Sequence, residues 1–169
     1  LFFIFAGVEW KIVHIDETDS TNRWLRQWVG DAHESRDGQA VCVVADYQTA
    51  GRGCGTNTWE AERGKNLLYS MLIHPADVPV NRQFLISMAV ANSIAKVVSE
   101  CVGNVSIKWP NDIYVGDKKI CGILIEHTLK GSVVKDSISR VMSQGSLFLM
   151  LSFVFSLRSS SAVRPASFA

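Results

Sequence analysis

The sequence predicts one α+β domain, with a mixed, largely antiparallel sheet and helices packed on one face of it. Three observations lead to this fold class. The 169 residues suffice for one domain of ordinary size and are too few for two well-filled ones. Apolar residues make up 47% and charged residues 20%, as in globular proteins that bury a core. Strand and helix patterns do not alternate strictly, and two of the strands flank a tight turn, which favours antiparallel pairing.

The first part of the chain predicts two strands and a helix. Residues 8–15 alternate weakly between apolar and polar and predict a strand. After a polar turn, Asp19 or Ser20 is suited to cap a helix that continues to about Val29. A charged loop then leads to residues 40–47, whose β-branched side chains predict a buried strand.

The middle of the chain predicts a long loop, a strand and a helix. Residues 48–65 hold four glycines and few large apolar side chains. Loops of this length inside a compact domain are usually functional or disordered. Residues 66–73 predict a strand. From residue 81 to about residue 101 apolar side chains recur at helical spacing, which predicts one amphipathic helix.

A short strand and a hairpin follow. Residues 105–108 predict a strand that Pro110 ends, because proline lacks the N–H that a sheet needs. Residues 113–115 and 119–126 flank Gly116 and Asp117, a pair typical of hairpin turns. The periodicity fades after Lys130, and the sequence shows no internal repeat.

The charge balance excludes two classes of protein. Lys and Arg number 17 against 16 Asp and Glu, a net charge of +1. This excludes a strongly basic nucleic-acid binder, so no nucleic-acid partner is expected, and it excludes an acidic solvating tail. The charges are nevertheless unevenly distributed. All 16 acidic residues lie between Glu9 and Asp136, so residues 137–169 look unlike the rest of the chain.

Cysteines and apolar runs give no sign of a metal site, a disulfide framework or a membrane anchor. The four cysteines form no CxxC pair, and no histidine stands at ligand spacing from them. We expect free thiols in a reducing compartment, and therefore a cytoplasmic protein. The apolar run 147–157 is too short to span a bilayer, so no membrane is expected. The first residues lack the basic start of a signal peptide, and we expect a truncated or mis-started end.

Three segments could carry chemistry. In the first, Gly51, Arg52 and Gly53 form a glycine-rich loop whose backbone N–H groups and guanidinium suit a phosphate or carboxylate. No Gly-Lys-Ser/Thr follows, so this is not a P-loop, and a dinucleotide fingerprint is incomplete. A flexible surface loop is the alternative. Trp59, which ends the loop, could stack on a ligand or anchor the loop to the core.

The second segment is Lys108 with the four residues after it. Pro110 stiffens the backbone, so the ammonium of Lys108 is suited to neutralise a carboxylate or phosphate during transfer. Asp112 could orient Lys108 or help hold a metal ion on a phosphate. The alternative is an ordinary surface salt bridge.

The third segment is Ser20, Thr21 and Asn22 at a helix start, joined by Gln48 before the glycine loop. Hydroxyls and amides there can cap the helix, which is the default interpretation. They can also hydrogen-bond a polar, uncharged group of a ligand.

Five segments occur in an order that one family shares. They are DSTN at 19–22, QTAGRG at 48–53 with Trp59, NLLYS at 66–70, KWPND at 108–112 and KICGILIE at 119–126. Together they resemble the biotin protein ligases, or biotin–[acetyl-CoA-carboxylase] ligases. The likeness covers roughly residues 8–136, and the intact KWPND segment makes it specific.

The resemblance implies the class II synthetase-like, or biotin–lipoate ligase, fold. It also implies a reaction in which the carboxylate of biotin is joined to the α-phosphate of ATP, with Mg²⁺, to give biotinyl-5′-AMP. The ε-amine of a lysine on a biotin carboxyl carrier domain then takes the biotinyl group. No nucleic acid or membrane is implied as a partner.

The resemblance also implies the residues of the site. Those expected to bind biotin are Ser20, Thr21, Asn22, Gln48, Gly51, Arg52, Gly53, Cys54 and Lys108. Those expected to bind ATP or the adenylate are Arg52, Asn57, Trp59, Lys108 and Asn111. Lys108 and Arg52 are expected to be catalytic, and no side chain is assigned to a metal ion. The ureido group of biotin is neutral, which fits hydroxyls and amides at its end of the site.

The chain departs from the family pattern at two places. Many relatives carry Arg where this loop has Cys54 and Gly where it has Thr56, so we expect faster leakage of the adenylate, measurable as its release from the pure protein. A Gly- and Asn-containing strand is expected after Ile138, but Ser139 onward shows no such strand. We therefore predict an incomplete catalytic domain over residues 1–138 and an atypical tail, foreign or disordered, over residues 139–169.

Two alternatives remain open. One is a non-catalytic pseudoenzyme that still binds biotin or the carrier domain. The other is a lipoate or octanoyl ligase or transferase of the same superfamily, although the chain lacks the Arg-Arg and glycine triplet of those proteins. A bare nucleotide-binding module is disfavoured because no P-loop is present.

Overall fold

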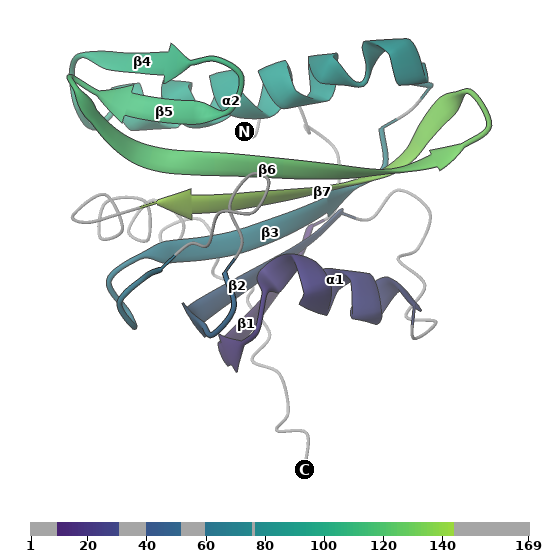
Figure 1. The fold of residues 1–169 in the computed structure, drawn as a ribbon, viewed down its shortest axis with the longest axis horizontal. Coiled ribbons are helices and arrows are strands. Elements are labelled where there is room, and N and C mark those ends of the chain that lie inside the picture. The colour runs from purple at the N-terminus through teal and green to yellow at the C-terminus, as the bar shows by residue number, and fades with distance from the viewer. Residues whose placement is uncertain (1–9, 31–39, 52–59, 76, 144–169) are drawn as a thin grey trace.

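The computed structural model describes residues 10–30, 40–51, 60–75 and 77–143, which form a seven-stranded sheet flanked by two α-helices (Figure 1). The strands are β1 Trp10–Thr18, β2 Ala40–Gln48, β3 Leu67–Ile73, β4 Val105–Lys108, β5 Asp112–Val115, β6 Lys118–Lys130 and β7 Val133–Ser143. The helices are α1 Thr21–Gly30 and α2 Phe84–Ser99, the latter preceded by the 3₁₀ turn η1 Val80–Arg82.

The strand order within the described sheet is β1-β2-β3-β7-β6-β5-β4. β1 and β2 run parallel, and every other neighbouring pair is antiparallel. The prediction of a mixed, largely antiparallel sheet is therefore confirmed. Each strand and helix predicted as far as residue 126 is present, with ends that differ by a few residues.

Strand β7 corrects the expectation of no strand beyond Ser139. It continues to Ser143 between β3 and β6, and residues 139–143 are buried. These five residues therefore belong to the sheet and not to an atypical tail. Serines at 137, 139 and 143 remove the contrast between apolar and polar positions on which a strand pattern depends. The rest of the expected tail lies outside the described residues.

The two helices cover opposite faces of the sheet, so the prediction of helices on one face is wrong. Val41 and Val43 of β2 pack with Leu25 of α1. Cys42, between these two valines, packs with Val90 of α2. Successive side chains of a strand point to opposite faces, so α1 and α2 lie on different sides. Strand β2 is apolar at both sets of positions, as expected of a strand covered on both faces.

The larger apolar cluster lies on the face covered by α2. Side chains of α2 pack there against β3, β5, β6 and β7, and Met71 and Ile113 are almost completely buried. Each such side chain contributes about 1.5–3 kcal/mol through its burial. This face supplies the rigid scaffold, whereas the α1 face combines a smaller apolar cluster with buried polar side chains.

The cysteines agree with the expectation of free thiols where they are described. Cys42, Cys101 and Cys121 form no disulfide, and Cys54 lies outside the described residues. Among the helices that the structure describes, none is both long and apolar enough to cross a membrane.

Candidate functional site

The candidate site begins where strand β1 turns into helix α1. The Ser20 carbonyl accepts the hydrogen bond of the Trp24 N–H at 2.9 Å, so Ser20 is the N-cap residue of α1. The pairing of β1 with β2 extends into this turn, because the Ala50 N–H donates to the Asp19 carbonyl at 2.9 Å. Gly51, the first residue of the predicted glycine loop, is buried next to this extension. The loop therefore leaves the sheet beside the start of α1.

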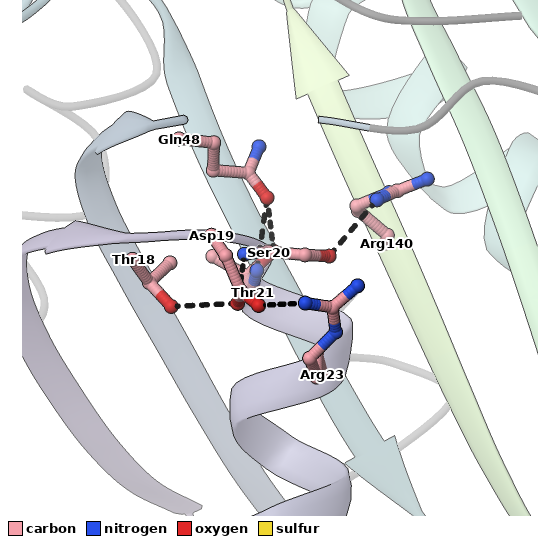
Figure 2. Close-up of polar contacts among 7 residues, drawn as sticks. All are labelled: Thr18, Asp19, Ser20, Thr21, Arg23, Gln48 and Arg140. Carbon is pink, nitrogen blue, oxygen red and sulfur yellow. Dashed lines mark hydrogen bonds and ion pairs between the residues drawn. The ribbon is translucent and has the colours of Figure 1, made fainter. Parts of the chain in front are cut away.

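Gln48, at the end of β2, caps the helix that starts beside it (Figure 2). Its Oε1 accepts the Thr21 N–H at 2.9 Å and lies 3.1 Å from Thr21 Oγ1. The first N–H groups of a helix lack partners within the helix, so this amide oxygen stabilises the start of α1. Gln48 and Thr21 were both predicted as biotin-binding residues, and the structure brings them together.

Ser70, in the middle of β3, joins the side chains of the helix start to the sheet. Its hydroxyl lies 2.7 Å from Thr21 Oγ1 and 2.6 Å from Asn22 Oδ1. An amide oxygen only accepts, so Ser70 donates to Asn22 and has a lone pair left for the Thr21 hydroxyl. The Asn22 amide in turn donates to Glu126 Oε2 at 2.6 Å. Hydrogen bonds among buried side chains such as these fix the orientation of Ser70, Thr21 and Asn22.

Arg140 completes the polar group from β7. One of its terminal nitrogens donates to Ser20 Oγ at 3.2 Å, and its side chain is only 1% exposed. Figure 2 shows this guanidinium approaching Ser20 from the β7 side, with Gln48 on the other side of Thr21. We refer to Ser20, Thr21, Asn22, Gln48, Ser70 and Arg140 as the polar cluster.

Lys108, the predicted catalytic lysine, lies at the far edge of the sheet from β1. It is exposed, and its Nζ stands 5.6 Å from the centre of the Tyr114 ring. One row of paired residues crosses the sheet from Lys108 to β2, through Asp112, Gly122, Met142, Leu68 and Ala45. Residues that pair directly across a sheet lie on the same face, and so do residues two positions apart in one strand. Leu68 therefore lies on the same face as Ser70, and Met142 on the same face as Arg140. Lys108 and the polar cluster therefore occupy the same face.

Two other residues of the KWPND segment have structural partners. Asp112 pairs with Lys119 at 2.7 Å, so the predicted role of orienting Lys108 is not what the carboxylate does in this structure. The Asn111 amide donates to the Ile123 carbonyl at 2.8 Å, and the Ile123 N–H donates to the Asn111 carbonyl. Asn111, predicted to bind the adenylate, thus ties the β4–β5 turn to β6. The Trp109–Pro110 peptide bond within this turn is cis.

Five predicted site residues lie outside the described residues: Arg52, Gly53, Cys54, Asn57 and Trp59. Their roles stay predictions. Within the part of the chain that the structure describes, no three His, Cys, Asp or Glu side chains converge as metal ligands would.

The structure adds three residues that the sequence did not single out as site residues. Ser70 and Glu126 end two of the segments shared with the family. Apart from Ser70 and Tyr69, which carry hydroxyls, every side chain of β3 is apolar. That break in an apolar strand was a usable signal. Arg140 gave none, because it was assigned to a tail with no predicted structure.

Comparisons with known proteins place these observations in a family. Residues 15–141 match the model of the Biotin/lipoate A/B protein ligase family. The Biotin--[acetyl-CoA-carboxylase] ligase of Mycobacterium tuberculosis is 32% identical over 126 residues, which are 72% of this chain and 46% of that protein. The Bifunctional ligase/repressor BirA of Salmonella typhimurium is 37% identical over 115 residues, 66% of this chain and 33% of that protein. The chain therefore spans less than half the length of these relatives.

Solved structures agree on the fold. The biotin protein ligase of Leishmania major in complex with biotinyl-5-AMP has a TM-score of 0.60 and 25% identity, over 86% of this chain and 66% of that one. The biotin acetyl coenzyme A carboxylase synthetase of Helicobacter pylori with bound biotinylated ATP has a TM-score of 0.61 and 22% identity, over 96% and 68%. This chain belongs to the Biotin/lipoate A/B protein ligase family, with the fold of a biotin protein ligase catalytic domain.

Proposed function

We propose that this protein activates biotin with ATP as biotinyl-5′-AMP and transfers the biotinyl group to a lysine of a biotin carrier protein. The observation that carries the proposal is the polar cluster on the same face of the sheet as Lys108. Relatives named as biotin ligases in Mycobacterium tuberculosis and Arabidopsis thaliana support the choice of biotin as substrate.

Four members of the polar cluster, Ser20, Thr21, Asn22 and Gln48, offer uncharged hydroxyls and amides, which suit the neutral ureido headgroup of biotin. Gln48 is 5% exposed, and its Nε2 is a buried donor that has no hydrogen-bond partner among the residues that the structure describes. A buried donor left without an acceptor costs about 1–3 kcal/mol. The carbonyl oxygen of a ureido group would supply that acceptor.

Lys108 would act at the other end of the substrate. A carboxylate oxygen of biotin attacks the α-phosphorus of ATP, and pyrophosphate leaves with the electrons of the bond that breaks. The Lys108 ammonium neutralises the carboxylate and the charge that gathers on the phosphate oxygens. In the second step the uncharged amine of the carrier lysine attacks the acyl carbon, AMP leaves, and the amine loses a proton.

Magnesium would accompany ATP and stabilise charge on its phosphates. Mg²⁺ usually keeps several waters and takes its other ligands from phosphates and one or two carboxylates. Arg52 and Trp59, at either end of the glycine loop, are proposed to close over the adenylate and to exclude water from it.

We also propose a cytoplasmic location and a carrier domain of a biotin-dependent carboxylase as partner. Free thiols at Cys42, Cys101 and Cys121 are typical of a reducing compartment, where disulfides are rare. The name of the mycobacterial relative supports a carboxylase as the protein that receives biotin.

The test is an incubation of the protein with ATP, Mg²⁺, labelled biotin and a purified carrier domain. We expect label on the carrier domain. Lys108→Ala should lower the rate of adenylate formation about 100- to 1,000-fold, the effect of removing one charge-stabilising group. The matched control is Lys118→Ala, which removes another exposed lysine from the start of β6 and should keep the wild-type rate.

The same experiment separates the alternatives. Biotin that binds but never reaches the carrier domain would indicate a non-catalytic binder. Transfer of lipoate and not of biotin would indicate a lipoate ligase. Either result would overturn the proposal.

A further inference from the structure

The side chains expected to receive the biotin headgroup are already bonded to one another or to the protein around them. Thr21 is bonded to Gln48 through its N–H and to Ser70 through its hydroxyl, and Asn22 is bonded to Ser70. Ser20 Oγ accepts a hydrogen bond from the guanidinium of Arg140. A ligand headgroup that reaches these three residues therefore meets side chains that already hold contacts inside the protein.

Arg140 differs from the other members of the polar cluster in size and charge. It is among the largest fully buried side chains of the described residues, with 1% exposure. Its backbone pairs with Ser70 of β3 and Leu124 of β6, so it enters the cluster from the centre of the sheet. A guanidinium only donates hydrogen bonds. At Ser20 it takes one of the two lone pairs of the hydroxyl oxygen.

We propose that Arg140 is an internal plug of the headgroup subsite. Its guanidinium occupies the place beside Ser20 that a headgroup takes on binding, and it must move before the ligand enters. The inference rests on the proposed function, because it assumes that biotin is the ligand. It adds a residue that limits affinity, on a strand from which no site residue was expected.

A smaller side chain at this position should therefore tighten binding. In Arg140→Ala the headgroup no longer displaces a charge-assisted hydrogen bond, and the volume of the guanidinium becomes available. We expect the Kd for biotin to fall about tenfold or more, since the bond that the wild type must break is of the stronger, charged kind.

The experiment is a calorimetric titration of the full chain with biotin alone, without ATP. The wild type, Arg140→Ala and Arg82→Ala are compared after circular dichroism has shown that each is folded. Arg82 is an exposed arginine of η1, so its loss removes a charge without touching the polar cluster, and its Kd should equal that of the wild type. In parallel, the Nε–Hε signal of Arg140 is followed by NMR in the wild type during addition of biotin.

Tighter binding by Arg140→Ala, with a shift of the Arg140 signal on addition of biotin to the wild type, would support the plug. Equal or weaker binding by the variant would overturn it, and weaker binding would make Arg140 a ligand contact. If Arg140→Ala does not fold, the NMR experiment on the wild type decides by itself. An Arg140 signal that does not change when biotin is added would then overturn the proposal. If the wild type binds biotin and the variant binds no better, the proposed function stands. If neither binds biotin, both proposals fall.

Discussion

The two faces of strand β3 differ more than their shared backbone would suggest. On the α2 face, Tyr69 and Met71 are buried in the main apolar cluster. On the α1 face, Ser70 lies between them and holds the side chains of Thr21 and Asn22. Adjacent positions of one strand thus serve packing on one side and recognition on the other.

The same division holds in β7. Val141 packs into the apolar cluster, whereas Arg140 beside it enters the polar cluster. A strand held rigidly by packing on one face positions polar groups on its other face more exactly than a loop does. Changes in the apolar cluster of the α2 face should therefore lower stability with little effect on binding, and changes in the polar cluster of the α1 face should affect binding more than stability.

The largest contrast is expected in thiol chemistry on the α2 face. Burial raises the pKa of Cys42 and Cys121 from 9.0 to about 12. At pH 8 this lowers their thiolate fraction about a thousandfold, and the thiolate is the reactive form. We expect iodoacetamide to leave both unmodified in the native protein and to modify both in denaturant, as read by peptide mass spectrometry. Rapid native modification of Cys42 would mean that the α2 face is not sealed.

Met71→Ala should give the largest loss of stability. Met71 is 1% exposed in the main cluster, and removing such a side chain costs about 2–5 kcal/mol. Urea unfolding measures this loss. Biotin affinity, measured well below the unfolding transition, should stay within twofold of the wild type. A large loss of affinity would contradict the separation of the two faces.

Ser70→Ala is the matched variant on the other face of the same strand. It leaves Thr21 and Asn22 without a shared partner, at an expected cost of about 1–3 kcal/mol. Biotin affinity should fall clearly, because the headgroup residues lose their fixed orientation. Unchanged affinity with lowered stability would show that Ser70 only supports the fold.

Arg26→Ala should have the smallest effect. Arg26 pairs with Glu126 at 2.8 Å, but the two side chains are 56% and 37% exposed. Exposed ion pairs contribute about 0–1 kcal/mol. Since Glu126 keeps its hydrogen bond from Asn22, thermal unfolding and biotin binding should both stay near wild type. A larger effect on binding would mean that Arg26 helps to hold Glu126 for Asn22.

The parts of the fold that were predicted best are those where a single residue, such as a proline or a glycine, determines the local backbone. Pro110 ended the predicted strand 105–108, which matches β4 residue for residue, and Gly116, with a positive φ of 56°, forms the predicted turn after β5. Which face of the sheet each helix covers could not be predicted in the same way. Strand β2 is apolar at alternate and intervening positions alike, so its sequence does not say which face meets which helix.

Only part of the candidate site could be predicted from the sequence, because only some of its residues lie at the ends of strands and helices. Ser20, Thr21, Asn22 and Gln48 are close in space because β1 and β2 end together, and motifs at the ends of elements revealed them. Arg140 and Ser70 lie in the middle of strands. A polar residue inside a strand shows its purpose only when the pairing of distant strands is known.

The side-chain amide of Gln48 links the stability of the start of helix α1 to the binding of a ligand. Its oxygen accepts the Thr21 N–H in the first turn of α1, and its nitrogen is buried without a hydrogen-bond partner among the described residues. The hydrogen bond from the Thr21 N–H to this side chain links the end of β2 to the first turn of α1. A ligand that accepts a hydrogen bond from the Gln48 nitrogen should hold this side chain in place and so slow deuterium uptake at the Thr21 amide. The exchange rate of that one backbone proton would then report whether the ligand is bound.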